Sequence, residues 1–265
     1  MMTPDAAVTS HPFLISAVQF ERDLNAGNLS VADLAHLAVK HGASGVEYRD
    51  VHWRQREEEI DFLSSQLQSA RLQAVYAVLT PLYHRDPAQR QQLFRDIDDA
   101  AALGAKLLRV PLGISPVADA EGDALRESAR LAVAQAAQRG IRIAVENNSR
   151  APGEKIAEIR TALMEIRSPA LGTNLDFANY ATTGQDPLTA IRALGPRIIY
   201  VHAKDARRTE RGLQSTFLGG GTLPLREIFA ALANTGREFQ LCFEFPGGMD
   251  PEEDIEKSKG FLATL

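Results

Sequence analysis

Short apolar runs alternate along the chain with longer stretches in which apolar residues recur every three or four positions. Runs of the first kind are typical of buried strands, and stretches of the second kind are typical of helices that pack on one face. The predicted strands are Phe13–Phe20, Gly45–Asp50, Gln73–Thr80, Lys106–Gly113, Ile141–Asn147, Gly172–Phe177, Arg197–Lys204 and Phe239–Phe245. The helices predicted between and after them are Ser30–His41, Glu57–Leu72, Ala88–Leu103, Asp123–Arg139, Glu154–Ile166, Pro187–Leu194, Pro224–Asn234 and Pro251–Leu265.

Residues that commonly begin and end helices support these boundaries. Ser30 with Asp33 is typical of a helix start. Gly42, Gly104 and Gly140 each come just after a predicted helix end, where glycine is favoured.

The number of strand–helix units predicts the fold class. Eight units in 265 residues give about 33 residues per unit, which suits a closed parallel barrel. A doubly wound open sheet is the alternative, but it needs fewer strands, and no G-x-G-x-x-G motif follows the first strand. We therefore expect an α/β protein with a single (β/α)8 TIM barrel over residues 1–265, in which residues 1–12 form a flexible N-terminal extension.

Four predicted strands place an acid or a histidine near their carboxyl ends. These residues are Glu146, Asp176, His202 and Glu244. Working residues of such barrels lie at this end of the strands. Because side chains alternate between the two faces of a strand, all four are predicted to point into the barrel and to converge.

The seventh strand illustrates the predicted alternation. Ile199, Val201 and Ala203 are expected to face the helices, while Tyr200, His202 and Lys204 are expected to face the interior.

Two glutamates, an aspartate and a neutral histidine would make a metal shell of one nitrogen and three oxygens. Such a shell suits one divalent ion, with Mn²⁺, Mg²⁺ or Co²⁺ favoured and Zn²⁺ acceptable. Without an ion, the three carboxylates would repel one another and raise their own pKa values. Each residue alone has a simpler explanation, as an ion pair, a helix cap or a hydrogen-bonded core histidine. Their joint register favours the metal site.

Composition excludes several other classes. Asp and Glu number 34 against 29 Lys and Arg, so the net charge is -5 and a nucleic-acid partner is not expected. The single cysteine, Cys242, allows neither an intrachain disulfide nor a cysteine-based zinc site. The first residues lack the features of a signal peptide, and no apolar run is long enough to span a membrane. We expect a cytoplasmic protein that has no membrane partner.

With these residues placed, the chain resembles the xylose isomerase-like TIM-barrel superfamily from Ala17 to Phe245. The resemblance is to its sugar phosphate isomerase/epimerase branch, which includes ketose 3-epimerases, hydroxypyruvate isomerase and inosose dehydratase. The segments that carry it are Gly45-Val46-Glu47-Tyr48, Val145-Glu146-Asn147, Leu175-Asp176-Phe177, Val201-His202-Ala203-Lys204-Asp205 with Arg208, Leu218-Gly219-Gly220-Gly221 and Phe243-Glu244.

The resemblance implies roles for the converging residues. Glu146, Asp176, His202 and Glu244 would hold the metal, and Glu146 and Glu244 would also be catalytic, exchanging a substrate proton from opposite faces.

The resemblance also points to residues around the substrate. Arg208 matches an arginine that holds a substrate oxygen, although a solvated charge explains it equally well. Asn179 stands where epimerases usually have a histidine; its amide donates a hydrogen bond but carries no proton. Lys204 either contacts substrate or pairs with Asp205. The remaining substrate contacts expected are Glu47 and, from the loop after the third strand, Tyr83.

These expectations describe a divalent-metal-dependent isomerase or epimerase that acts on a ketose or a related hydroxy-carbonyl compound through a metal-bound enediolate. The alternatives are a lyase or dehydratase that uses the same site on a keto-sugar or keto-inositol, and a non-catalytic sugar-binding relative. An endonuclease of the same superfamily fits less well, because it needs several zinc ions and further histidines. The expected partner is a small sugar or keto-polyol, and a homodimer is compatible with the resemblance.

Overall fold

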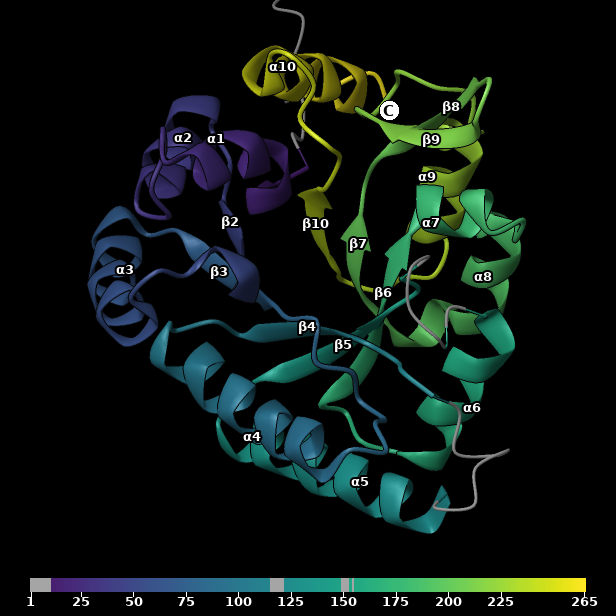
Figure 1. Ribbon diagram of the computed structural model, residues 1–265. Coiled ribbons are helices and arrows are strands. Elements are labelled where there is room, and N and C mark those ends of the chain that lie inside the picture. The colour runs from purple at the N-terminus through teal and green to yellow at the C-terminus, as the bar shows by residue number, and fades with distance from the viewer. Residues whose placement is uncertain (1–10, 115–121, 149–152, 154) are drawn as a thin grey trace, which may run out of the picture.

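The computed structural model describes residues 11–114, 122–148, 153 and 155–265, and most of the predicted N-terminal extension lies outside them. Parallel strands close into a barrel in the order β1-β10-β7-β6-β5-β4-β3-β2 (Figure 1). The barrel strands are β1 Phe13–Ser16, β2 Gly45–Arg49, β3 Gln73–Ala77, β4 Leu107–Pro111, β5 Arg142–Glu146, β6 Leu171–Asp176, β7 Ile198–His202 and β10 Gln240–Phe243. The predicted (β/α)8 barrel is confirmed.

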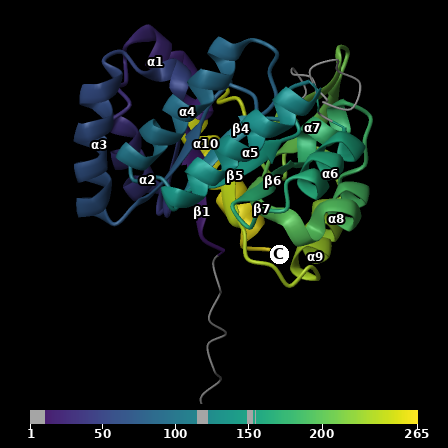
Figure 2. The same cartoon turned by 90° about the horizontal axis from the view of Figure 1, so that it is seen from below.

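Helices surround the barrel (Figure 2), and all eight predicted stretches are helical over most of their length. Two short helices, Glu21–Ala26 and Phe177–Thr182, were not predicted, and Phe177 begins a helix where the sixth strand was predicted to end. The helices are α1 Glu21–Ala26, α2 Asp33–His41, α3 Arg56–Ala70, α4 Pro87–Ala102, α5 Gly122–Gln138, α6 Ile156–Glu165, α7 Phe177–Thr182, α8 Pro187–Leu194, α9 Leu225–Ala233 and α10 Pro251–Leu262. Gly42, Gly104 and Gly140 have positive φ angles, as their positions after helices predict. Within the described ranges, no helix combines the length and apolar character needed to cross a membrane.

The first strand is shorter than predicted. Ala17–Phe20 forms a 3₁₀ helix because Ser16 caps it: the Ser16 Oγ accepts from the Val18 N–H, and the Gln19 side chain accepts from the Ser16 N–H. The prediction of a strand over this segment was wrong. Ala17 and Phe20 are buried and Val18 is half-buried, and an apolar run of this length does not distinguish a strand from a helical turn.

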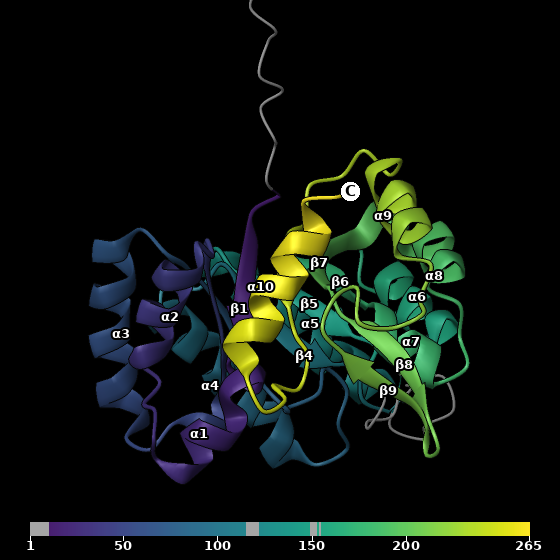
Figure 3. The same ribbon diagram turned by 90° about the horizontal axis from the view of Figure 1, so that it is seen from above.

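A short antiparallel hairpin follows β7 and was not predicted. Its strands are β8 Asp205–Thr209 and β9 Gly212–Thr216, and they contact α7 at one side of the barrel (Figure 3). The charges in residues 206–211 indicated a solvated loop. They are compatible with a hairpin that leaves Arg207 and Arg208 exposed.

The barrel interior has an apolar floor below its polar end. The floor consists of Leu14, Val75, Leu107, Ala144, Tyr200 and Cys242. Residues on the opposite strand faces, such as Ile143, Val145 and Val201, belong to the larger core under the helices. The predicted alternation of faces is confirmed for these positions.

Ile199 departs from this alternation. The pairing of β6 with β7 shifts between Thr173 and Asn174, so that Ile199 packs against the interior cluster and not with Val201. Its predicted face was therefore wrong. The inward position is open because the neighbouring residue is Gly172: a Cβ at Gly172 would lie 2.7 Å from Ile199 Cδ1 and 2.8 Å from the Arg197 carbonyl oxygen.

We predict that Gly172→Ala lowers the free energy of unfolding by about 1–3 kcal/mol, because the added methyl group overpacks the barrel floor. Urea denaturation measures the change. Gly260→Ala is the matched control, since a Cβ at Gly260 in α10 meets nothing within 4 Å. Ile199→Ala added to Gly172→Ala should recover part of the loss, and no loss in the single variant would contradict this account of the bulge.

Candidate functional site

Four buried side chains converge at the carboxyl end of the barrel. Glu146 ends β5, Asp176 ends β6, His202 ends β7 and Glu244 directly follows β10. Asp176 and His202 are paired across neighbouring strands, and His202 is paired with Cys242 two residues before Glu244. Strand register thus brings residues from four separate segments to one level of the barrel, as the sequence predicts.

The His202 ring lies at the centre of this group. Its Nδ1 is 3.1 Å from Glu146 Oε1, 3.5 Å from Asp176 Oδ2 and 3.9 Å from Glu244 Oε2. His202 and Asp176 have no exposed surface, and Glu146 is 4% exposed. One ligand atom from each of Glu146, Asp176 and His202 lies within 4.8 Å of the other two.

Glu47 binds the other side of the His202 ring. Its Oε2 lies 2.8 Å from His202 Nε2 and accepts a hydrogen bond from the Tyr200 hydroxyl, while its Oε1 accepts from Ser16 Oγ. Both carboxylate oxygens therefore have protein partners in a fully buried position. The structure places Glu47, which the resemblance assigned to substrate, against a metal-ligand candidate. Its bond to Nε2 leaves the Nδ1 side of the ring for Glu146 and Asp176.

The Glu47–His202 contact stabilises opposite charges. Burial acts to raise the pKa of Glu47, but His202, Arg109 and Tyr200 together hold that pKa well below its usual range. Burial acts to lower the pKa of His202, yet Glu47 and the neighbouring carboxylates raise it well above the ordinary value. The ionised Glu47 carboxylate therefore accepts the hydrogen bond from Nε2–H.

Two buried cations accompany the carboxylates. Arg109 Nη1 donates to Glu146 Oε2 at 3.1 Å, and Lys204 Nζ lies 2.8 Å from Asp176 Oδ2 and also contacts Glu244 Oε2. Burial acts to raise the pKa of Glu146, but Arg109, His202 and Lys204 outweigh it and lower the pKa to about 2. These cations thus keep Glu146 ionised, and the rise in carboxylate pKa expected from repulsion does not occur at this residue.

The donor set fits a divalent cation. When His202 is neutral, as a metal ligand must be, the four carboxylates, Glu47 included, exceed the charges of Arg109 and Lys204 by two. One divalent ion in place of the second ring proton of His202 would balance this excess. His202 Nδ1 and Asp176 Oδ2 are buried without a hydrogen-bond partner among the described residues, although they lie within ion-pair distance of other groups. Buried polar atoms that converge without bonding one another are suited to sharing an ion.

Asp176 is held by three backbone-linked hydrogen bonds. Asn147 Nδ2 donates to the Asp176 carbonyl, and the Asn147 side-chain oxygen accepts from the Asp176 N–H, each at 3.0 Å. Asp176 Oδ1 caps α7 by accepting from the Asn179 N–H. Of the two Asp176 carboxylate oxygens, Oδ2 is therefore the one that faces His202 and Lys204. The sequence marked Asn147 as part of a motif but gave no sign of this role.

The remaining predicted residues lie at varying distances from the group. Asn179 is half-buried at the start of α7, where its backbone is bonded to Asp176. Arg208 is exposed on the hairpin. Tyr83 is fully buried in the outer core, and burial raises the pKa of its hydroxyl to about 12. Neither Arg208 nor Tyr83 has a hydrogen bond or ion pair with the four converging residues in the described structure.

Lys204 and Asp205 do not pair with each other. Lys204 turns to Asp176 and Glu244, whereas the Asp205 carboxylate accepts the backbone N–H groups of Ala206, Gly221 and Leu223. A Cβ at Gly221 would lie 2.3 Å from the Ala206 carbonyl oxygen. The glycine-rich segment after the hairpin therefore packs directly against β8.

Signals for the residues that the sequence analysis left unassigned differ in strength. Tyr200 lies two residues before His202 on the same strand face, so alternation already placed it inside the barrel. Arg109 lies within β4 and pairs with Glu146 on the neighbouring strand β5, a contact that the pattern of a single strand does not predict. Ser16 gave no signal, because its partner Glu47 is 31 residues away.

Several solved structures are similar to this chain. A probable 3-DHS dehydratase, AsbF from Bacillus anthracis, is 16% identical, with 95% of this chain and 98% of that chain covered at a TM-score of 0.76. D-allulose 3-epimerase from Methylomonas sp., in complex with D-allulose, is 20% identical, with 96% and 97% covered at 0.75. IolI protein with a bound zinc atom is 16% identical, with 96% and 94% covered at 0.76. At these identities, the similarity establishes the fold.

No functionally curated protein shows significant sequence similarity to this chain. The family model described as xylose isomerase-like TIM barrel, however, matches residues 35–265. This match spans most of the chain and includes every residue of the converging group. The chain belongs to the xylose isomerase-like TIM-barrel family.

Proposed function

We propose that the protein is a divalent-metal-dependent isomerase or epimerase of a ketose or a related hydroxy-carbonyl compound. The observation that carries the proposal is the buried group of Glu146, Asp176 and His202, whose ligand atoms lie within 4.8 Å of one another. Glu244 would complete the shell once its carboxylate is shared with an ion. A divalent ion held here would polarise a substrate carbonyl and make the neighbouring C–H more acidic.

Glu146 and Glu244 would handle the proton. They come from β5 and from the end of β10, which are separated in the barrel by β6 and β7, so the two carboxylates approach the centre from different sides. One carboxylate would take a proton from a substrate carbon, and the other would return a proton to the opposite face or to the neighbouring atom. Arg109 holds Glu146 in its ionised form, as a general base requires.

Lys204, Asn179 and Arg208 would orient the substrate. Lys204 lies between Asp176 and Glu244, so a substrate oxygen near these carboxylates would be within reach of its ammonium group. Asn179 follows Asp176 on α7, where its amide would donate a hydrogen bond to a second oxygen. Arg208 would approach only from the hairpin.

A lyase is the second candidate, and Asn179 favours it. This residue stands where epimerases usually have a histidine, and an amide cannot carry a proton as that histidine can; dehydration further needs a proton donor for the leaving hydroxyl group, which another residue would supply. The buried Lys204 ammonium beside Glu244 offers a cationic donor for that oxygen. In isomerisation and in dehydration alike, Glu146 or Glu244 would remove the initial proton from the substrate carbon.

The metal site predicts a stoichiometry. After dialysis against Mn²⁺, elemental analysis should count about one ion per chain, and His202→Ala should lose it because Nδ1 is the central ligand. His36→Ala is the matched control, since His36 is exposed on α2. Several ions per chain, or none in the wild-type protein, would contradict the proposal.

Solvent deuterium uptake and product mass distinguish an isomerase from a dehydratase. With Mn²⁺ supplied, a panel of ketoses and keto-inositols is incubated in deuterium oxide; isomerisation should add solvent deuterium without other mass change, and dehydration should remove one water. Glu146→Gln and Glu244→Gln should each slow the active reaction by about 10²–10⁴-fold. Failure of any substrate to exchange deuterium would favour a non-catalytic sugar-binding relative.

Glu47 should act on metal affinity through His202. Glu47→Gln replaces a buried carboxylate that fixes the ring, so we expect Mn²⁺ affinity to fall about 10–100-fold, as measured by calorimetry. Tyr200→Phe removes one of the donors to Glu47 and should have a smaller effect in the same direction. The control is Glu57→Gln, because Glu57 is exposed in the first turn of α3. Unchanged affinity in a folded Glu47→Gln protein would show that the bond is not needed to orient His202.

A further inference from the structure

The two buried cations at the polar end of the barrel contact its carboxylates in different ways. Arg109 Nη1 donates to Glu146 Oε2, whereas the other oxygen of that carboxylate, Oε1, faces His202 Nδ1 at 3.1 Å. Arg109 therefore stabilises the Glu146 carboxylate through one oxygen and leaves the inward oxygen to other ligands.

Lys204, in contrast, contacts the oxygens that face His202 Nδ1. Its Nζ lies 2.8 Å from Asp176 Oδ2, which is 3.5 Å from Nδ1, and it also contacts Glu244 Oε2, which is 3.9 Å from Nδ1. Asp176 has no second oxygen to offer, because its Oδ1 accepts the Asn179 N–H at the start of α7. An ion shared by His202 and Asp176 would thus need an oxygen that Lys204 already uses.

The contact between Lys204 and Asp176 is electrostatic and poorly directed. The two groups are within ion-pair distance, but Asp176 Oδ2 has no hydrogen-bond partner of good geometry among the described residues. Two positive charges that meet at one oxygen repel each other, and burial strengthens the repulsion because water does not screen it. The ammonium group and a divalent ion are therefore expected to exclude each other from Oδ2.

The Lys204 side chain is able to turn away while its backbone stays in place. The residues on both sides are held, since the Ala203 N–H donates to the Cys242 carbonyl at 2.8 Å and Asp205 pairs with Thr216 in the hairpin. Both carboxylate oxygens of Asp205 already accept backbone N–H groups, so Asp205 offers the ammonium group no new ion pair. A released ammonium group would remain at the carboxyl end of the barrel, where substrates of such barrels bind.

We propose that Lys204 and the divalent ion compete for Asp176 Oδ2 and Glu244 Oε2, so that ion binding transfers the Lys204 ammonium group from these carboxylates to an oxygen of the substrate. Because this step requires the ion, it rests on the function proposed above. It adds an order of binding: the ion binds before the substrate, since only then is the ammonium group free for a substrate oxygen. A substrate whose oxygen becomes negatively charged when a C–H proton is removed gains most from this cation.

Loss of the Lys204 ammonium group should strengthen ion binding. Lys204→Met keeps a long unbranched side chain without the charge, so we expect Mn²⁺ to bind about tenfold more tightly in calorimetric titrations of the EDTA-treated full chain. A lysine that only supports the carboxylates would give the opposite sign, because its loss would let them take up protons. Lys204→Gln tests the same step, and circular dichroism should show that both variants are folded.

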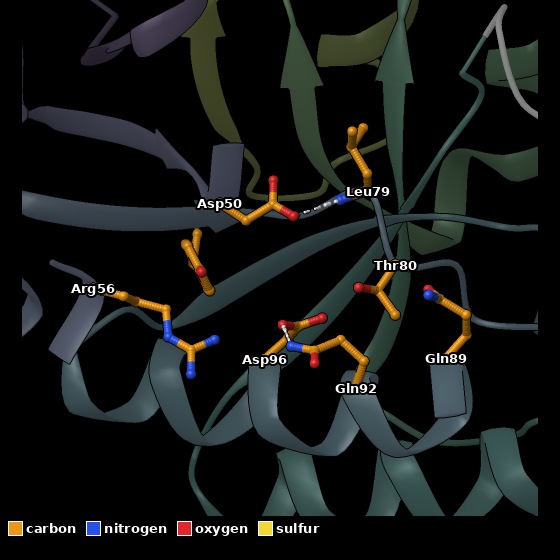
Figure 4. Close-up of a pocket in the computed structure, with 8 residues that line it drawn as sticks. Asp50, Arg56, Leu79, Thr80, Gln89, Gln92 and Asp96 are labelled. Carbon is orange, nitrogen blue, oxygen red and sulfur yellow. Dashed lines mark hydrogen bonds between the residues drawn. The ribbon is translucent and has the colours of Figure 1, made fainter. Parts of the chain in front are cut away.

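Two control variants exclude effects of overall charge and of ions bound elsewhere. Lys106→Met makes the same charge change at an exposed position and should leave Mn²⁺ affinity unchanged. Figure 4 shows two further carboxylates, Asp50 and Asp96, which line a cavity outside the barrel. Asp96→Asn should leave both the affinity and the number of bound ions unchanged, which would assign the measured heat to the barrel carboxylates.

The position of the ammonium group gives a direct readout. In a crystal structure of the Mn²⁺-loaded wild-type protein, Lys204 Nζ should lie beyond ion-pair distance of Asp176 Oδ2. Such a displacement would separate competition for the oxygen from a general effect of charge on affinity.

Two results would overturn the proposal while leaving the metal site intact. One is Mn²⁺ affinity that is unchanged or weaker in folded Lys204→Met and Lys204→Gln proteins. The other is a Lys204 ammonium group that stays on Asp176 Oδ2 in the Mn²⁺-loaded protein. If the wild-type protein binds no Mn²⁺, the proposed function itself is wrong, and the role of Lys204 proposed here is wrong with it.

Discussion

The buried hydrogen bond between His202 and Glu47 is the contact on which the polar end of the barrel depends. It joins β7 to β2 across the interior, between residues 155 positions apart in sequence. Since Glu47 binds Nε2, the ring can present only Nδ1 to Glu146, Asp176 and Glu244. The hydrogen bond to Nε2 therefore determines which ring nitrogen of His202 can share a metal ion with the three carboxylates.

Around this bond, the charges of the buried carboxylates are balanced by ion pairs with buried cations and not by solvent. Arg109 serves Glu146, and Lys204 serves Asp176 and Glu244, while all of these groups are nearly or fully buried. Removing ionised groups from water is costly unless each has a partner. The arrangement keeps the Glu146 carboxylate charged although it is buried, and it leaves the Nδ1 side of the His202 ring facing the other carboxylates.

The sequence predicted those parts of the structure that depend on local pattern. Alternation along single strands placed Glu146, Asp176 and His202 inside the barrel, because the face of a residue in a regular strand follows from its neighbours. Ile199 escaped this rule because its inward turn needs the space left by Gly172 on another strand. The contact of Glu47 with His202 was equally inaccessible, since no local pattern reports a partner on the far side of a barrel. The hairpin was missed because its exposed arginines resemble those of a loop.

Asp205 fastens the base of that hairpin by accepting three backbone N–H groups, from Ala206, Gly221 and Leu223. The strands beyond it pair mainly with each other, and the turn at Glu210 and Arg211 is exposed. Insertions and deletions are best tolerated at exposed tips whose base is independently held. Over evolutionary time, this segment can therefore change length and composition while Lys204, one residue before the fastening point, keeps its place. The hairpin beyond Asp205 can thus vary between related proteins, whereas the barrel end that carries Lys204 stays fixed.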